Sequence, residues 1–208
     1  MIHITKILKK INLTMLAYAI LISLILSLSI ALQAFSYEST AQQRIADEII
    51  RFHVLANSDD AQDQELKMQV KEAVLKKMEP ILQGSPNIHI VRELINENIH
   101  NIESVARYVL YNHGITDSVS ASLARVHFPQ ITYTNMTLPQ GYYEALQISI
   151  GSGSGQNWWC VMFPMLCFVD GIAGPKEEME ELMAQVLTEE EYQQVFNVRF
   201  RTADWWLN

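Results

Sequence analysis

The chain from Leu13 to Phe35 is mostly apolar and contains no charged residue, and it directly follows a short segment that carries three lysines. At about 1.5 Å rise per residue, a helix over this stretch is ~34 Å long, enough to cross a bilayer. The lysines at positions 6, 9 and 10 keep the first residues in the cytoplasm under the positive-inside rule. The pattern therefore predicts an exported protein.

The end of the apolar segment divides the chain into three predicted parts. We expect residues 1–36 to form a basic n-region with a hydrophobic export signal or membrane anchor, which meets the membrane through residues 11–35. Residues 37–48 are expected to be a polar tether, and residues 49–208 one extracytoplasmic domain. Small residues at Ser29 and Ala31 fit a cleavage site, but the apolar run is longer than a usual signal core, so both outcomes stay open.

The next residues alternate in polarity and then change to a helical period. Strand 49–55 places Ile50, Phe52 and Val54 on one side and Arg51 and His53 on the other. Apolar residues at every fourth position predict a helix over 66–78 that ends near Pro80. A second, longer apolar stripe predicts a helix from about residue 86 to Gly114.

The second half predicts strands over 118–128, 141–150 and 157–163, and the last is expected to be central because it is apolar on both faces. A helix is expected after Gly174 and Pro175, and a last strand over 198–201. Thr188 and Glu191 predict a capping box at the start of a short helix. The fold class is α+β: a single domain with helices packed on a mostly antiparallel sheet, preceded by an N-terminal transmembrane or signal helix.

The distribution of charge limits the kinds of partner that the domain can bind. The 208 residues carry a net charge of -8, and every formal charge before Glu38 is positive. The domain itself is therefore more acidic than the whole chain. Because such a domain is repelled by polyanions, no nucleic acid is expected as a partner.

The two cysteines, Cys160 and Cys167, allow three interpretations. A catalytic thiol would need a nearby base, for which His53 and His127 are candidates. A disulfide is permitted outside the cytoplasm, provided that the chain reverses at 163–165, because a straight strand would hold the two Cα atoms too far apart. Two cysteines without neighbouring histidines are a poor zinc signature, so no metal and no cofactor are expected.

A run of alternating glycine and serine spans Gly151 to Gly155 and resembles a phosphate loop only superficially. No Lys-Ser/Thr follows it, and the next element is a strand rather than a helix. It is interpreted as a turn between two strands. The next residues, Trp158 and Trp159, point to opposite faces of a strand, so one of them is a candidate binding anchor.

Two long segments carry a resemblance to a known family. The first is Arg51-Phe52-His53-Val54-Leu55-Ala56-Asn57-Ser58-Asp59, followed by Asp63-Gln64 and Leu66-Lys67. The second runs from Leu138-Pro139 through Gly141-Tyr142-Tyr143-Glu144-Ala145-Leu146 and Ile150-Gly151 to Asn157-Trp158-Trp159-Cys160-Val161, Phe163-Pro164 and Leu166-Cys167-Phe168. In this order, after an export segment, they resemble the stage II sporulation protein R family. The departures are Thr134, Gln140, Gln147 and Met165, where the family usually has glycine, alanine, arginine and a second proline.

The resemblance implies an intercellular signalling protein of sporulation rather than an enzyme. Such a protein is exported from the forespore into the intermembrane space. There it activates the membrane-embedded aspartic protease of the mother cell that processes pro-sigma factor E. Two alternatives remain: a cysteine-dependent cell-wall or peptide hydrolase that uses Cys160, and a membrane-anchored scaffold. The candidate partner-binding residues are Arg51, His53, Asn57, Gly151, Gly153, Gly155, Asn157, Trp158 and Trp159.

Overall fold

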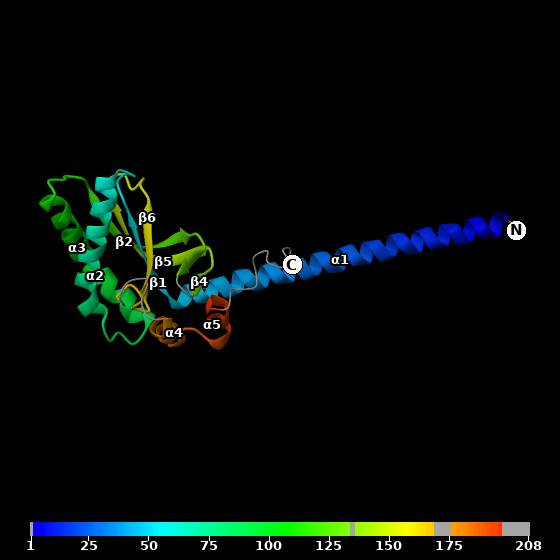
Figure 1. Cartoon of the computed structure of the whole chain (residues 1–208). Coiled ribbons are helices and arrows are strands. Elements are labelled where there is room, and N and C mark those ends of the chain that lie inside the picture. The colour runs from blue at the N-terminus through cyan, green and yellow to red at the C-terminus, as the bar shows by residue number, and fades with distance from the viewer. Residues whose placement is uncertain (1, 134–135, 169–175, 197–208) are drawn as a thin grey trace. The chain divides into compact units, whose positions relative to one another are not determined.

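The computed structural model describes residues 2–133, 136–168 and 176–196. The chain divides into two compact units, Met1–Ala41 and Gln42–Asn208. A long first helix, α1 (Ile2–Glu48), makes up the first unit and runs on into the second. The second unit contains all the strands and the remaining helices (Figure 1).

The apolar segment predicted to meet the membrane lies within α1. Its residues Thr14–Gln33 form a helical span of 20 residues with a mean hydropathy of 2.5, and none of that span is buried. By length and composition it is compatible with either a signal sequence or a membrane anchor.

The stretch predicted to be a tether is helical up to Glu48. Ile45 and Ala46 are buried and pack into a hydrophobic core of the second unit. The folded domain therefore includes the last turns of α1 and begins a few residues before the predicted boundary at residue 49.

Four strands form the main sheet, in the order β2 (Val119–Phe128), β5 (Gly141–Ile150), β1 (Ile50–Leu55) and β6 (Asn157–Phe163). β1 is parallel to β5, whereas the β1–β6 and β2–β5 pairs are antiparallel. The predicted mostly antiparallel sheet of an α+β domain is confirmed.

The predicted central position of β6 is wrong. Among the described residues, β6 lies at one end of the strand order and β5 and β1 lie inside it. β6 is apolar on both faces because two separate cores pack against the two sides of the sheet: Met162 belongs to one core and Val161 to the other.

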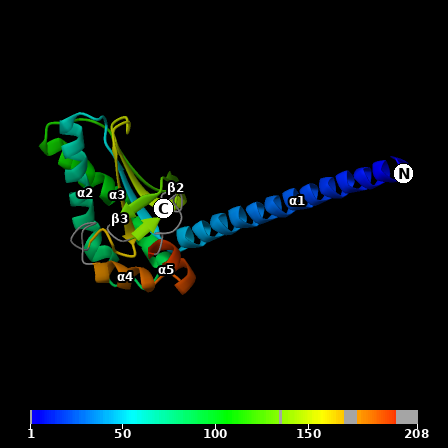
Figure 2. The same ribbon diagram turned by 45° about the vertical axis from the view of Figure 1, so that its right-hand side comes forward.

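Helices α2 (Ala61–Leu82) and α3 (Ile88–Asn112) lie together on one face of the sheet (Figures 1 and 2). Their apolar stripes pack against Phe52 and Val54 of β1 and against Leu146 of β5. The Asn87 side chain accepts from the amides of His89 and Ile90 and so caps α3. Both helices match the periodic pattern, although α2 continues through Pro80 to Leu82.

The other face is covered by smaller elements and by the end of α1. These are the hairpin of β3 (Ile131–Tyr133) and β4 (Met136–Leu138), which the sequence analysis did not predict, and helices α4 (Lys176–Ala184) and α5 (Glu189–Phe196).

The capping box predicted at the start of α5 is present. The Thr188 amide donates to Glu191 Oε2 at 2.9 Å, and the Glu191 amide donates to Thr188 Oγ1 at 3.4 Å. The predicted strand over 198–201 lies outside the described residues, as do Gly174 and Pro175.

Candidate functional site

The two segments that carried the family resemblance meet at one end of the sheet. The turn after β1, residues 57–59, bonds to the loop between β5 and β6, residues 151–156. We call this contact the turn–loop junction. It forms because β1 lies between β5 and β6, so the chain leaves β1 beside the loop that joins its two neighbours.

Asn57 is the centre of the turn–loop junction. Its side-chain Oδ1 accepts from the Ser152 amide at 2.9 Å, and its carbonyl accepts from the hydroxyls of Ser152 and Ser154 at 2.7 and 2.8 Å. Its Nδ2 donates to Asp63 Oδ2 at 3.0 Å. All the polar groups of the Asn57 side chain are therefore engaged inside the chain.

Neighbouring polar residues extend the turn–loop junction onto α2. Ser58 Oγ donates to Asp63 Oδ2 at 2.6 Å, and this bond is the main cause that lowers the pKa of Asp63. Lys67 Nζ donates to Gln64 Oε1 at 2.6 Å and to the Gln156 carbonyl at 3.0 Å. Helix α2 is thus bonded to the residue that directly precedes β6.

Two of the predicted glycines are required because the turn after β1 passes too close to them to leave room for a side chain. A Cβ on Gly151, whose φ is +55°, would lie 2.2 Å from Asn57 Oδ1, and a Cβ on Gly155 would lie 2.1 Å from the Ser58 carbonyl oxygen. A Cβ on Gly153, whose φ is +62°, would make only ordinary contacts, 3.6 Å from the Ser149 Cβ and 3.7 Å from the Leu55 Cβ. Gly151 and Gly155 therefore build the turn–loop junction.

Arg51 was predicted as a surface contact, and the structure buries it completely, with 0% of the residue exposed. Its Nη2 donates to Tyr133 Oη at 2.7 Å, and its guanidinium lies over the rings of Phe128 and Tyr143, 4.0 and 5.0 Å from their centroids. Burial lowers the pKa of Arg51 and raises that of Tyr143 to about 12. Arg51 is therefore inaccessible to a partner at the surface of the folded domain.

His53 is likewise inside the domain, 4% exposed. Its ring stacks on Trp159, with ring centroids 3.8 Å apart and an interplanar angle of 16°. The centroid of the Phe128 ring lies 5.7 Å from that of His53. Burial lowers the pKa of His53 to about 4; the side chain of Asn157 acts in the opposite direction, and the charge of Arg51 lowers the pKa further. His53 is therefore a neutral aromatic partner at neutral pH.

Trp158 and Trp159 point to opposite faces of β6, as the alternation predicts, and each is half-buried. Trp158 packs on the α2/α3 side, edge-on to Phe52 with centroids 5.5 Å apart and with Lys71 Nζ 5.1 Å above its ring. Trp159 packs on the other side. The exposed Asn157 precedes them, so three of the predicted contact residues reach solvent at the start of β6.

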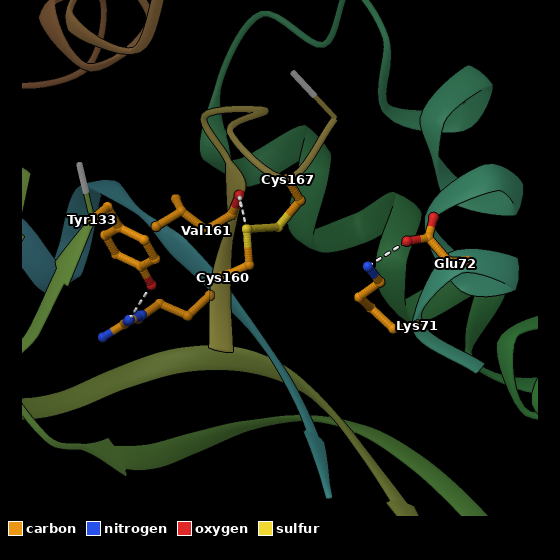
Figure 3. Close-up of a disulfide and its surroundings, with 7 residues drawn as sticks. Lys71, Glu72, Tyr133, Cys160, Val161 and Cys167 are labelled. Atoms are coloured by element: carbon orange, nitrogen blue, oxygen red, sulfur yellow. Dashed lines mark hydrogen bonds and ion pairs between the residues drawn. A yellow bond between two sulfur atoms is a disulfide. The ribbon is translucent and has the colours of Figure 1, made fainter. Parts of the chain in front are cut away.

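A disulfide joins Cys160 to Cys167, with 5.9 Å between the Cα atoms (Figure 3). The chain reverses after Phe163, and the Cys167 amide donates to the Val161 carbonyl at 3.0 Å. Lys71 and Glu72 form an ion pair on the neighbouring helix α2, and the disulfide sulfur of Cys160 lies 3.8 Å from the Val161 carbonyl oxygen. Both cysteines are buried in the core beneath α2 and α3.

The structure gives neither candidate base access to Cys160. Cys160 pairs with Phe52 and therefore shares its face of the sheet, whereas His53 lies on the opposite face. His127 belongs to β2, three strand positions from β6, which is about 14 Å at usual strand spacing. Both sulfurs are also engaged in the disulfide, so the thiolate that the hydrolase alternative needs is missing here.

No group of three or more histidine, cysteine, aspartate or glutamate residues that could hold a metal ion occurs among the residues that the structure describes. A small apolar cavity lies beside the disulfide, with Tyr133, Met136, Cys160 and Leu166 in its wall. Its lining offers little for polar chemistry.

These features define a class of protein: an α+β domain that follows an apolar helix long enough to cross a membrane and uses most of its polar motif residues for internal contacts. The comparisons place the chain within that class. The family model for stage II sporulation protein R matches residues 46–173. Stage II sporulation protein R of Bacillus subtilis (strain 168) is 38% identical over 168 residues, which cover 78% of this chain and 75% of that protein. The chain belongs to the stage II sporulation protein R family. No solved structure matches it.

Sequence reasoning missed the residues that surround Arg51. Phe128, Tyr133 and Tyr143 are remote from Arg51 in the chain. Phe128 and Tyr143 lie on predicted strands, but the sequence did not indicate which strands pair with each other. The available signal is chemical: an arginine in the middle of an apolar strand needs either an internal partner or a place on the surface, and the prediction of a surface contact left out the first possibility.

Proposed function

We propose that this protein is exported and activates the membrane-embedded aspartic protease that processes pro-sigma factor E. Membership of the stage II sporulation protein R family is the observation that carries the proposal. The apolar helical span before the domain is compatible with export, and the acidic charge of the domain disfavours a nucleic acid as its partner.

The proposed mechanism is a shift of population. The domain binds the extracytoplasmic face of the protease and favours its active arrangement, which requires tighter binding to that state than to the inactive one. A tenfold shift needs about 1.4 kcal/mol of differential affinity, which one half-buried aromatic side chain can supply. Asn157, Trp158 and Trp159 are the proposed contact residues at the start of β6. Asn57, Gly151 and Gly155 hold that segment in place through the turn–loop junction.

The test is reconstitution of processing in a non-sporulating host. The protease, the pro-sigma factor and the full chain are co-expressed, and conversion of the pro-sigma factor is followed by gel mobility. We expect conversion only when the full chain is present. If the exported and folded chain gives no conversion, the proposed function is wrong.

A cysteine variant separates the proposed activator from the hydrolase alternative. Removing the disulfide by Cys160→Ala opens an eight-residue loop and costs about 2.5 kcal/mol in the chain-entropy model. We therefore expect Cys160→Ala and Cys167→Ala to lower the level of folded protein equally and to retain conversion per folded molecule. Loss of conversion in the folded Cys160→Ala protein alone would point to thiol chemistry instead.

A further inference from the structure

β2 is the other end strand of the described sheet, and its outward edge has two different halves. The β2–β5 register runs without a break from Val119 opposite Ile150 to Phe128 opposite Gly141. In an antiparallel pair, the N–H and C=O of one residue point to the same side and those of the next residue point to the other side. Once the backbone groups of one β2 residue are known to point away from β5, the directions of the backbone groups of all the other β2 residues follow.

The first half of this edge is closed by α3. The Ala121 amide donates to Glu103 Oε1 at 3.1 Å, and the Val119 carbonyl accepts from Arg107 Nη1 at 3.5 Å. Residues 119 and 121 thus face outward and have side-chain partners. Glu103 is further paired with Arg107, with 3.5 Å between the charged atoms.

The second half of the edge is open. By the same alternation, the backbone groups of Leu123, Arg125 and His127 face outward, and no hydrogen bond joins them to another residue of the described chain. Exposed strand edges are usually shortened, covered or blocked, because they accept a further strand. Here α3 blocks one half and leaves the other half free.

The opposite end strand, β6, is less available. The loop that holds the disulfide folds back against it, and the Cys167 amide already occupies the Val161 carbonyl. The free backbone groups of β6 are therefore limited to its first few residues.

The side chains on the open half of β2 indicate the charge of a partner. Arg125 is exposed, donates to Gln43 Oε1 at 2.7 Å and lies 6.0 Å from the Tyr142 ring centroid. It has no ion pair among the described residues, and its cross-strand neighbour Glu144 is engaged by Arg92 at 2.8 Å. A carboxylate on an added strand would thus give Arg125 its first ion pair.

A second copy of the chain fits this edge poorly. A two-fold antiparallel pair of β2 strands centred on Arg125 would set the two guanidinium groups opposite each other, which is unfavourable. A shift in one direction moves the copy onto the half that Glu103 closes, and a shift in the other direction moves it onto Pro129, which has no N–H.

We propose that the open edge of β2, Leu123–His127, binds an extended segment of the partner protein by strand addition, with an acidic residue of that segment near Arg125. The inference rests on the proposed function, since the partner is the protease activated there. Arg125 bonds to the last turns of α1, the helix that carries the apolar span, so the edge lies where the chain enters the domain.

A proline substitution tests the strand addition, because proline removes one outward N–H without breaking a bond to β5. In the processing assay with the full chain, His127→Pro should lower conversion about tenfold, and the matched control His127→Ala, which keeps the amide, should stay within about twofold of wild type. Arg125→Glu should lower conversion more than Arg125→Gln. Equal conversion by His127→Pro and wild type overturns strand addition.

Hydrogen exchange of the wild-type chain gives a second measurement that needs no variant. Membranes that contain the protease should slow exchange of the amides at 123, 125 and 127 relative to protease-free membranes; no slowing overturns the inference. If the wild-type chain gives no conversion at all, the proposed function fails, and this inference fails with it. If the wild-type chain gives conversion but the exchange of these amides is unchanged, strand addition is wrong and the proposed function is unaffected.

Discussion

The two faces of the central sheet are stabilised by different kinds of contact. The face beneath α2 and α3 is an apolar layer in which the sheet contributes Phe52, Val54 and Leu146. The opposite face also holds an apolar core, but two polar residues of β1, Arg51 and His53, are buried there among aromatic rings. A single strand thus supplies an ordinary core residue to one side and a buried cation to the other.

This difference teaches that burial and polarity are separate properties of a position. The face beneath α2 and α3 depends on volume, because the residues that β1 and β5 contribute to it are apolar and make dispersion and hydrophobic contacts. The other face depends on how well aromatic rings and one hydroxyl compensate a guanidinium that has left water. Substitutions on the two faces should therefore fail in different ways.

The largest effect is expected on the apolar face. Phe52→Ala removes a fully buried ring that packs edge-on to Trp158, so we expect a loss of about 4 kcal/mol in the free energy of unfolding. Urea denaturation of the detergent-solubilised full chain, followed by tryptophan fluorescence, measures it. Phe52→Leu should lose only about 1 kcal/mol. A loss below about 2 kcal/mol for the alanine variant would contradict a tightly packed layer.

The next effect distinguishes volume from charge on the other face. Arg51→Ala leaves a cavity between Phe128 and Tyr143, and we expect a loss of about 3 kcal/mol. Arg51→Met fills most of the space without a buried charge and should stay within about 1 kcal/mol of wild type, because a desolvated cation contributes little net stability. The same denaturation experiment compares them. If methionine is as costly as alanine, the guanidinium contacts are the main contribution.

The sequence predicted one face of the sheet better than the other, for a physical reason. Helices α2 and α3 follow from a stripe with a 3.6-residue period, a local property of one segment. β1 was also predicted, but only its apolar side was assigned correctly. The partners of Arg51 are contributed by β2, β3 and β5, and a local alternation of polar and apolar residues contains no information about them.

The same reasoning explains the error at β6. An apolar strand is buried on both faces, but burial on both faces does not require neighbours on both edges. Asn57 and Gly151 were predicted only as candidate contact residues, and the sequence did not predict that they meet. Their mutual hydrogen bonds show that they belong together in structure, and a separate contact role stays a proposal.

The smallest predicted effect concerns the second polar residue, His53, and depends on pH. The pKa of His53 is about 4 in the folded chain, below the ordinary value of 6.5, so the unfolded chain binds more protons between these two values. The stability that neutral His53 provides is therefore complete above pH 6.5 and is lost as the pH falls towards 4. Between pH 7 and pH 5 the loss should be about 2 kcal/mol.

The control for this prediction is His53→Phe, which retains a ring against Trp159 and does not titrate. The carboxylates contribute equally to both proteins, so the difference between their pH curves isolates the histidine. We expect the wild-type curve to fall more steeply than the variant curve from pH 7 to pH 5, with the two parallel above pH 7. Parallel curves throughout would mean that His53 is protonated as easily inside the domain as in the unfolded chain. The polar face would then be open to water, and the contrast between the two faces would be lost.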